Sequence, residues 1–190
     1  MKSFLMNGAI FAAVLITGAL SAPAQNNAKA HVEIPILAAN PADVGTIEDI
    51  VRSSYETISG GVGVPRQWGR DRTLYDPNVR FVGLATNPKT GAVKVPPSAS
   101  EQDFADQSDG FMVKGGFTER ELAHEIHRYG NVATVLSSYE GKFASTGKVV
   151  TRGVNLFQLY FDGKRWWILS MVWDEERPDN PIPPQLQSKP

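Results

Sequence analysis

The spacing of apolar residues changes near residue 117, and this change restricts the folds that the chain can adopt. In the first half, apolar side chains such as Val44, Ile47 and Val51 recur every three or four residues, as on a helix with one buried face. In the second half, extended runs are separated by turn residues, which is typical of antiparallel strands joined by hairpins. We therefore expect an α+β protein in which helices come first and an antiparallel sheet follows.

Three helices are expected in the first half of the chain. Asn40 is a suitable N-cap for the first helix, Pro41 fits its first turn, and the glycine-rich run 60–63 ends it. Ser100 is a suitable N-cap for the third helix. The other elements expected here are a second helix over 65–75, a strand over 79–84, a hairpin tip over 87–91 and the third helix over 101–107.

Four strands are expected in the second half, over 117–129, 132–142, 149–161 and 166–174. In the first of them, alternation places Leu122 and Ile126 on the buried face. The same alternation places three acidic residues on the opposite face: Glu119, Glu121 and Glu125. By residue propensity the run 119–129 is also compatible with a helix, and the sequence leaves that alternative open.

The N-terminal residues have the layout of a cleavable secretion signal. Lys2 supplies an early positive charge, an apolar run extends over residues 9–20, and the small residues Ala22 and Ala24 fit the signal peptidase. An uncleaved membrane anchor is the alternative, but it needs roughly 20 apolar residues to cross the hydrocarbon layer, and this run is shorter. We expect a signal peptide at 1–24, and a periplasmic or secreted protein that is not attached to the membrane after cleavage.

Composition narrows the class of protein further. After cleavage roughly 165 residues remain, which suits one domain at 43–175, preceded by a linker or loosely docked arm at 25–42 and followed by a solvated Pro-rich tail at 176–190. The chain contains no cysteine, so neither disulfides nor thiolate metal ligands contribute. A formal net charge of −1 excludes the strongly basic surface of a typical nucleic-acid-binding protein.

Short residue blocks in both halves of the chain carry a resemblance to a known superfamily. They lie at 49–60, 66–68, 74–77, 129–133, 137–140, 152–155, 158–159, 165–167 and Trp173. With the order of elements, they resemble exported bacterial members of the nuclear transport factor 2-like superfamily, in its SnoaL-like branch. The resemblance implies a curved antiparallel sheet packed against three helices, a conical cavity between them, and a homodimer formed through the outer face of the sheet.

The resemblance does not imply a particular reaction. The superfamily includes isomerases, dehydratases, cyclases, epoxide hydrolases and non-catalytic binding proteins, so the fold cannot be converted into an activity. No motif in this chain matches the buried carboxylates and tyrosine of the ketosteroid isomerases residue by residue. No catalytic residue is therefore transferred, and no cofactor is expected.

His124 is the most suggestive single candidate for chemistry. On a strand it shares a buried face with Ile126, where an imidazole can act as a general base near neutral pH. The alternative is a core histidine whose ring bonds a backbone carbonyl, Tyr55 or Tyr139. His124 and His127 have the spacing of two metal ligands only on a helix, so no metal site is expected if this run is a strand.

Three other polar residues are candidates for the cavity. Asp71, next to Trp68 on the second helix, can look into the cavity mouth and accept a proton; the alternative is a salt bridge to a neighbouring arginine, or exposure to solvent. Arg152 and Gln158 share one face of the expected strand 149–161. If that face is inward, they can hold a carboxylate or a carbonyl group; if it is outward, they lie in a dimer interface or in water.

The aromatic side chains are expected to form mainly core, while their polar tips line the pocket. With them, the candidate ligand-binding residues are Tyr55, Trp68, Asp71, His124, Tyr139, Arg152, Gln158 and Trp173. The leading hypothesis is an exported binding or accessory protein for a small apolar or weakly polar ligand. The alternatives are a cofactor-independent lyase, isomerase or hydrolase with His124 or Asp71 as its base, and a protein-interaction module that uses the sheet face.

Overall fold

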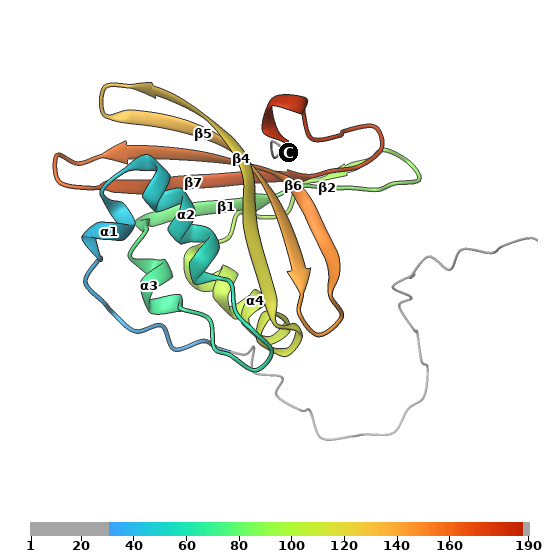
Figure 1. Cartoon of the computed structure of the whole chain (residues 1–190), viewed down its shortest axis with the longest axis horizontal. Helices are drawn as coiled ribbons and strands as arrows, with labels where there is room; N and C mark the ends of the chain where they lie inside the picture. Colours follow the sequence, from blue (N-terminus) through green and yellow to red (C-terminus); the bar gives the residue numbers. More distant parts are fainter. Residues whose placement is uncertain (1–30, 188–190) are drawn as a thin grey trace, which may run out of the picture.

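The computed structural model describes residues 31–187, so the expected signal peptide at 1–24 lies outside the described residues. Helices cross the concave face of a curved five-stranded sheet (Figure 1). The strands, in their order across the sheet, are β1 (Tyr75–Gly83), β7 (Trp166–Glu175), β6 (Lys148–Phe161), β5 (Val132–Phe143) and β4 (Phe117–Tyr129). Only the β1–β7 pair in this sheet, within residues 31–187, is parallel. The expected α+β class with a curved, mainly antiparallel sheet is confirmed.

The helices begin where the capping residues predict. Asn40 caps α1 (Pro41–Val44) and Ser100 caps α4 (Glu101–Gly115) with a full capping box. The single helix expected first is in fact two helices. The second, α2 (Ile47–Thr57), starts separately because the Thr46 hydroxyl accepts a hydrogen bond from the backbone N–H of Asp49. The third expected helix is longer than predicted and continues to Gly115.

The boundary between the second helix and the first strand differs from the prediction. The helix α3 (Trp68–Arg72) is short, and Tyr75 already opens β1 instead of closing the helix. Pro77 is tolerated inside β1 because this strand is at the edge of the sheet, and the register is irregular between Tyr75 and Arg80. The hairpin predicted around 87–91 is confirmed by β2 (Ala85–Thr86) and β3 (Val93–Lys94), which pair antiparallel.

A β-bulge in β4 changes which residues face the helices. Glu121 pairs with Tyr139 but Ala123 already pairs with Ser138, so Leu122 is an extra residue. Inward-facing positions are therefore odd-numbered before the bulge and even-numbered after it. The strand itself, which the sequence left open against a helix, is confirmed. The prediction that Glu119 and Glu121 share the outer face is wrong for this reason.

Residues 176–187 are not a solvated tail, which corrects the expectation for this part of 176–190; residues 188–190 lie outside the described residues. This C-terminal segment turns back and covers part of the convex face of the sheet, on the side opposite the helices (Figure 1). Ile182 and Leu186, the latter in the 3-10 helix η1 (Pro184–Leu186), are each only 2% exposed. The Ser138 hydroxyl donates to the backbone carbonyl of Leu186. Two buried apolar side chains and one buried hydrogen bond thus hold the segment against the convex face of the sheet. This is the face through which a homodimer was expected to form.

No helix within residues 31–187 has the length and apolarity needed to span a membrane. The main core lies between α2 and the concave face of the sheet, where Ile50, Leu74, Phe157 and Ile168 are fully buried. A second cluster around Trp68, Ala105 and Met112 joins α3 to α4. The space between these two clusters is not filled by side chains.

Candidate functional site

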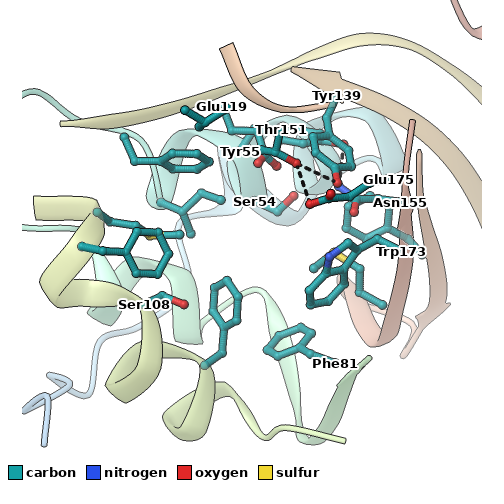
Figure 2. Close-up of a pocket in the computed structure, with 18 of the residues that line it drawn as sticks. Ser54, Tyr55, Phe81, Ser108, Glu119, Tyr139, Thr151, Asn155, Trp173 and Glu175 are labelled. Carbon is teal, nitrogen blue, oxygen red and sulfur yellow. Dashed lines mark hydrogen bonds between the residues drawn. The ribbon is translucent and has the colours of Figure 1, made fainter. Parts of the chain in front are cut away.

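A cavity of about 350 Å³ lies between α2, α4 and the concave face of the sheet (Figure 2). The residues that line it are Ser54, Tyr55, Ile58, Tyr75, Phe81, Phe104, Ser108, Phe111, Met112, Phe117, Glu119, Tyr139, Phe143, Val150, Thr151, Asn155, Phe157, Met171, Trp173 and Glu175. Phe111 and Val150 are about half exposed, at 50% and 46%, which places the mouth between α4 and the start of β6.

Half of the lining residues are aromatic, and helical spacing explains one wall. Phe104, Ser108, Phe111 and Met112 recur at intervals of three and four along α4 and so face the same way. The rings meet mostly edge to face: Phe104 and Trp173 have ring centroids 6.5 Å apart with an interplanar angle of 80°. Such packing builds rigid apolar walls.

Two aromatic walls depend on a neighbouring residue having no side chain. A Cβ at Gly83 would overlap the indole ring of Trp173, and a Cβ at Gly115 would overlap the ring of Phe143. Both glycines thus allow a ring to lie flat against backbone instead of filling the cavity. Gly83 and Gly115 therefore help to set the volume of the cavity, although neither residue lines it.

A chain of hydrogen bonds ends at the inner wall of the cavity. The Tyr55 hydroxyl oxygen lies 2.7 Å from Ser137 Oγ and accepts a bond of 3.1 Å from Asn155 Nδ2. The Ser137 hydroxyl donates to Glu121 Oε1 at 2.5 Å. Because the single Ser137 proton goes to Glu121, the Tyr55 proton goes to Ser137. Burial raises the pKa of Tyr55 well above its usual range, so the phenol stays protonated.

A second set of polar side chains, those of Thr151, Tyr139 and Glu175, lies at one side of the cavity. Thr151 Oγ1 lies 3.4 Å from the Tyr139 hydroxyl oxygen and 3.3 Å from Glu175 Oε1 (Figure 2). Burial raises the pKa of Tyr139, which therefore remains a neutral hydroxyl. Thr151 and Glu175 are brought together because β6 and β7 run antiparallel, with Gly153 opposite Glu175.

Glu119 is the most unusual group in the cavity. Its side chain points inward from β4, and among residues 31–187 it has no hydrogen-bonding or ionic partner. Loss of hydration in the aromatic surroundings raises the pKa of this carboxyl to about 8. A carboxyl with such a pKa is mainly protonated at neutral pH and exchanges with its carboxylate form, so it can give or take a proton.

Three of the residues predicted from the sequence line the cavity: Tyr55, Tyr139 and Trp173. Trp68 does not, because it packs against Phe104 in the α3–α4 cluster and its Nε1–H donates to Asp109 at 2.7 Å. Its role is to hold α4 in place.

Asp71 is buried below the cavity instead of facing its mouth. It is only 1% exposed and accepts a bond of 2.5 Å from the Thr57 hydroxyl and one of 3.4 Å from the Tyr75 hydroxyl. Burial raises the pKa of Asp71 to about 7. The two neighbouring arginines weighed as ion-pair partners bind other carboxylates: Arg70 binds Asp43 and Glu56, and Arg72 binds Glu101.

His124 faces the concave side but does not line the cavity. Its Nδ1 lies 3.0 Å from Glu121 Oε2, which connects it through Ser137 to the Tyr55 hydroxyl. His127 lies on the opposite face of the strand, as expected for the strand alternative. Among the described residues 31–187, no three histidine, cysteine, aspartate or glutamate side chains are grouped so as to hold a metal ion.

Arg152 and Gln158 lie on the convex face of β6, so the outward alternative holds. Asn155 and Phe157 on the same strand line the cavity, and alternation sends the even-numbered residues the other way. Arg152 pairs with Glu176 at 3.2 Å, and Gln158 accepts a bond of 2.8 Å from the Ser170 hydroxyl.

Apart from the tyrosines, sequence reasoning missed six polar residues of the cavity: Ser54, Ser108, Glu119, Thr151, Asn155 and Glu175. For Glu119 a signal was present, because Phe117 is an aromatic residue two positions earlier and so lies on the same face. No local signal marks the bulge that brings Glu119 and Ile126 to the same face although one is odd-numbered and the other even-numbered.

The chain is similar to several solved structures, whereas no family model and no curated protein matches the sequence. A protein of unknown function with a cystatin-like fold from Nostoc punctiforme is 7% identical, with a TM-score of 0.49, covering 70% of this chain and 95% of that chain. A nuclear transport factor 2-like protein of unknown function from Silicibacter pomeroyi is 12% identical, with a TM-score of 0.47, covering 70% and 94%.

A third similar structure is that of a protein from Parabacteroides distasonis that is described provisionally as a ketosteroid isomerase. It is 13% identical, with a TM-score of 0.46, and the match covers 74% of this chain and 96% of that chain. At such identities and TM-scores the similarity assigns neither a family nor an activity to this chain. The α+β fold, a curved sheet packed against helices, follows from the chain's own strands and helices.

Proposed function

We propose that this protein binds one small organic molecule in the cavity between α2, α4 and the sheet. The observation that carries the proposal is an aromatic cavity of about 350 Å³ that contains an unpartnered carboxyl, Glu119. This volume falls within the usual range of ligand pockets, roughly 300–1,000 Å³, and such pockets combine apolar walls with few polar groups.

The chemistry of the lining favours an organic ligand over water. A ligand with an apolar body gains dispersion contacts with the close-packed aromatic walls, which water in the same volume provides less well. A polar group on that ligand can bond Glu119, which has no protein partner among residues 31–187.

The binding test uses a neutral fluorescent probe, N-phenyl-1-naphthylamine, whose emission rises in apolar surroundings. We expect saturable binding with one site per chain in the wild-type protein. Ser108→Leu should abolish it, because Ser108 is buried and lines the cavity. Gly110→Leu is the matched control on the same helix, since a Cβ there meets nothing within 4 Å, and it should bind like the wild type.

Two results would count against a binding cavity. One is equal probe binding by Ser108→Leu and the wild type, which would place the probe elsewhere. The other is absence of probe binding by the wild type, together with native mass spectra of protein purified gently from its host that show no retained small molecule.

A second candidate function is a cofactor-independent lyase, isomerase or hydrolase in which Glu119 is the base. The observation that favours it is the raised pKa of Glu119, about 8, inside a cavity large enough for a substrate. The bases proposed from the sequence, His124 and Asp71, do not line the cavity. An activity found by screening should disappear in Glu119→Gln while probe binding remains, and full activity in that variant would remove Glu119 from the reaction.

The place of action proposed from the sequence is outside the cytoplasm, after removal of residues 1–24. Its support is the positive charge, the apolar run and the small residues at the N-terminus. Cell fractionation of the full chain, followed by N-terminal sequencing, tests it: a mature N-terminus at Gln25 is expected, and an intact Met1 in the cytoplasmic fraction would contradict it.

A further inference from the structure

The ionisable groups that line the cavity include no basic residue. Apart from tyrosines they are, within residues 31–187, the carboxyl groups of Glu119 and Glu175. Basic residues of the neighbouring strands lie elsewhere: Arg120 and Lys142 both bind Glu140 on the convex face. No cation among the described lining residues therefore balances the two carboxyl groups.

A buried arginine lies near this region but does not serve the cavity. The Arg66 guanidinium donates to the backbone carbonyls of Phe117, Ile58, Gly61 and Val64. These bonds fix the loop between α2 and α3 and direct the guanidinium toward backbone. Arg66 is absent from the residues that line the cavity.

The hydroxyl group nearest the inner wall offers an acceptor and no donor. The Tyr55 proton is committed to Ser137, because Ser137 donates to Glu121, and Asn155 already donates to the Tyr55 oxygen. What remains available to a ligand is an oxygen lone pair. Together with the ionised forms of the two carboxyl groups, this oxygen offers acceptors to a ligand; the hydroxyls of Tyr139 and Ser108 also line the cavity and can donate or accept.

The aromatic walls of the cavity also attract cations. Ring faces carry a negative quadrupole and bind ammonium groups, most strongly at tryptophan and when water is excluded. Phe81, Phe104 and Trp173 form a continuous cluster, with centroids 5.4 Å apart for the first pair and 6.5 Å for the second. Trp173 and Glu175 lie two residues apart on β7, so ring and carboxyl face the cavity together (Figure 2).

We infer that the cavity takes an organic cation: an ammonium group held by Glu119, Glu175 and the aromatic rings, attached to an apolar body that fills the remaining volume. The inference rests on the proposed function and names its class of ligand. An anionic ligand is disfavoured by two carboxyl groups, and a purely apolar ligand would leave Glu119 without a partner.

Binding of a cation should be coupled to the protonation of Glu119. The titratable groups that face Glu119 are Tyr55 from α2, Tyr75 from β1, Tyr139 from β5 and Glu121 on its own strand. Glu175 shares the cavity. An ammonium group stabilises the carboxylate form, so affinity should rise as pH increases from 6 toward 9 if the cation itself does not titrate.

The experiment compares benzyltrimethylammonium with neopentylbenzene, its neutral isostere, as competitors of N-phenyl-1-naphthylamine at pH 8.5. We expect the cation to bind at least about tenfold more tightly, from cation–π attraction together with one carboxylate. Glu119→Gln should reduce this preference to less than about threefold. Glu125→Gln is the matched control, because Glu125 lies on the same strand but faces the convex side, and it should keep the full preference.

The possible outcomes separate the two proposals. If the fluorescent probe binds but the cation and its isostere compete equally, the cation inference fails and the binding function stands. The cation inference fails in the same way if Glu119→Gln keeps the wild-type preference. If the fluorescent probe does not bind and native mass spectra show no retained small molecule, the proposed function itself fails. A preference lost in Glu119→Gln and kept in Glu125→Gln supports both.

Discussion

Replacement of Glu119 by glutamine should change how the stability of the protein depends on pH. In the folded protein the pKa of Glu119 is about 8, compared with an ordinary value of 4.5. A carboxyl whose folded pKa is the higher one holds its proton more tightly in the folded state. Its stabilising contribution is therefore complete below about pH 4.5 and is lost as pH rises toward 8.

The size of this effect follows from the two pKa values. Each unit of difference corresponds to about 1.4 kcal/mol, so the wild type should lose roughly 4 kcal/mol relative to Glu119→Gln between pH 5 and pH 9. The side chain is partly accessible through the cavity, so hydration makes this an upper bound. Glutamine has nearly the same shape and does not titrate, so packing changes little.

The assay is urea unfolding of both variants at half-unit intervals of pH, reported as the difference in the free energy of unfolding. All other titrating groups occur in both proteins and cancel in the difference. We expect the advantage of Glu119→Gln to grow steadily with pH. A difference that stays constant within about 1 kcal/mol from pH 5 to pH 9 would show that Glu119 titrates as an ordinary exposed carboxyl, and the reasoning from desolvation would be refuted.

Three other predictions concern the surroundings of the cavity. Gly83→Ala should push Trp173 into the cavity, weaken probe binding and cost about 1–3 kcal/mol in urea unfolding; unchanged binding would contradict the close contact. Leu186→Ala should cost about 2–5 kcal/mol, and a cost near zero would mean that the C-terminal segment is loosely held. The folded pKa of Asp71 is raised to about 7, so the wild type should lose up to about 4 kcal/mol of stability as pH rises from about 4 to 7. Asp71→Asn keeps the bond from Thr57 and should not show this loss. Parallel pH profiles of stability for the two proteins would exclude a raised pKa of Asp71.

Much of the fold was predictable because its signals are local. Helix starts followed from capping residues such as Asn40 and Ser100, and strands followed from alternation between turn residues. The errors arose where tertiary structure overrides local preference. Tyr75 extends an edge strand instead of a helix because it pairs with Ile168, almost a hundred residues later in the chain.

The site was less predictable, because its polar residues come together only in three dimensions. The bond between Asn155 and Tyr55 joins residues 100 positions apart. Aromatic residues such as Tyr139 and Trp173 were found because large rings in a small domain mark its interior. Glu119 was missed because a glutamate in an alternating strand normally faces water.

The extra residue Leu122 has a consequence for how related chains should be compared. A single-codon deletion of Leu122 would restore strict alternation along β4 and leave the residues on both sides on their present faces, because Glu121 already pairs with Tyr139 and Ala123 with Ser138. Glu119 would stay in the cavity, so a related chain one residue shorter at this point can keep the same inner face. Alignments of homologous sequences therefore need to allow a gap at this position before the identity of residue 119 is compared between them.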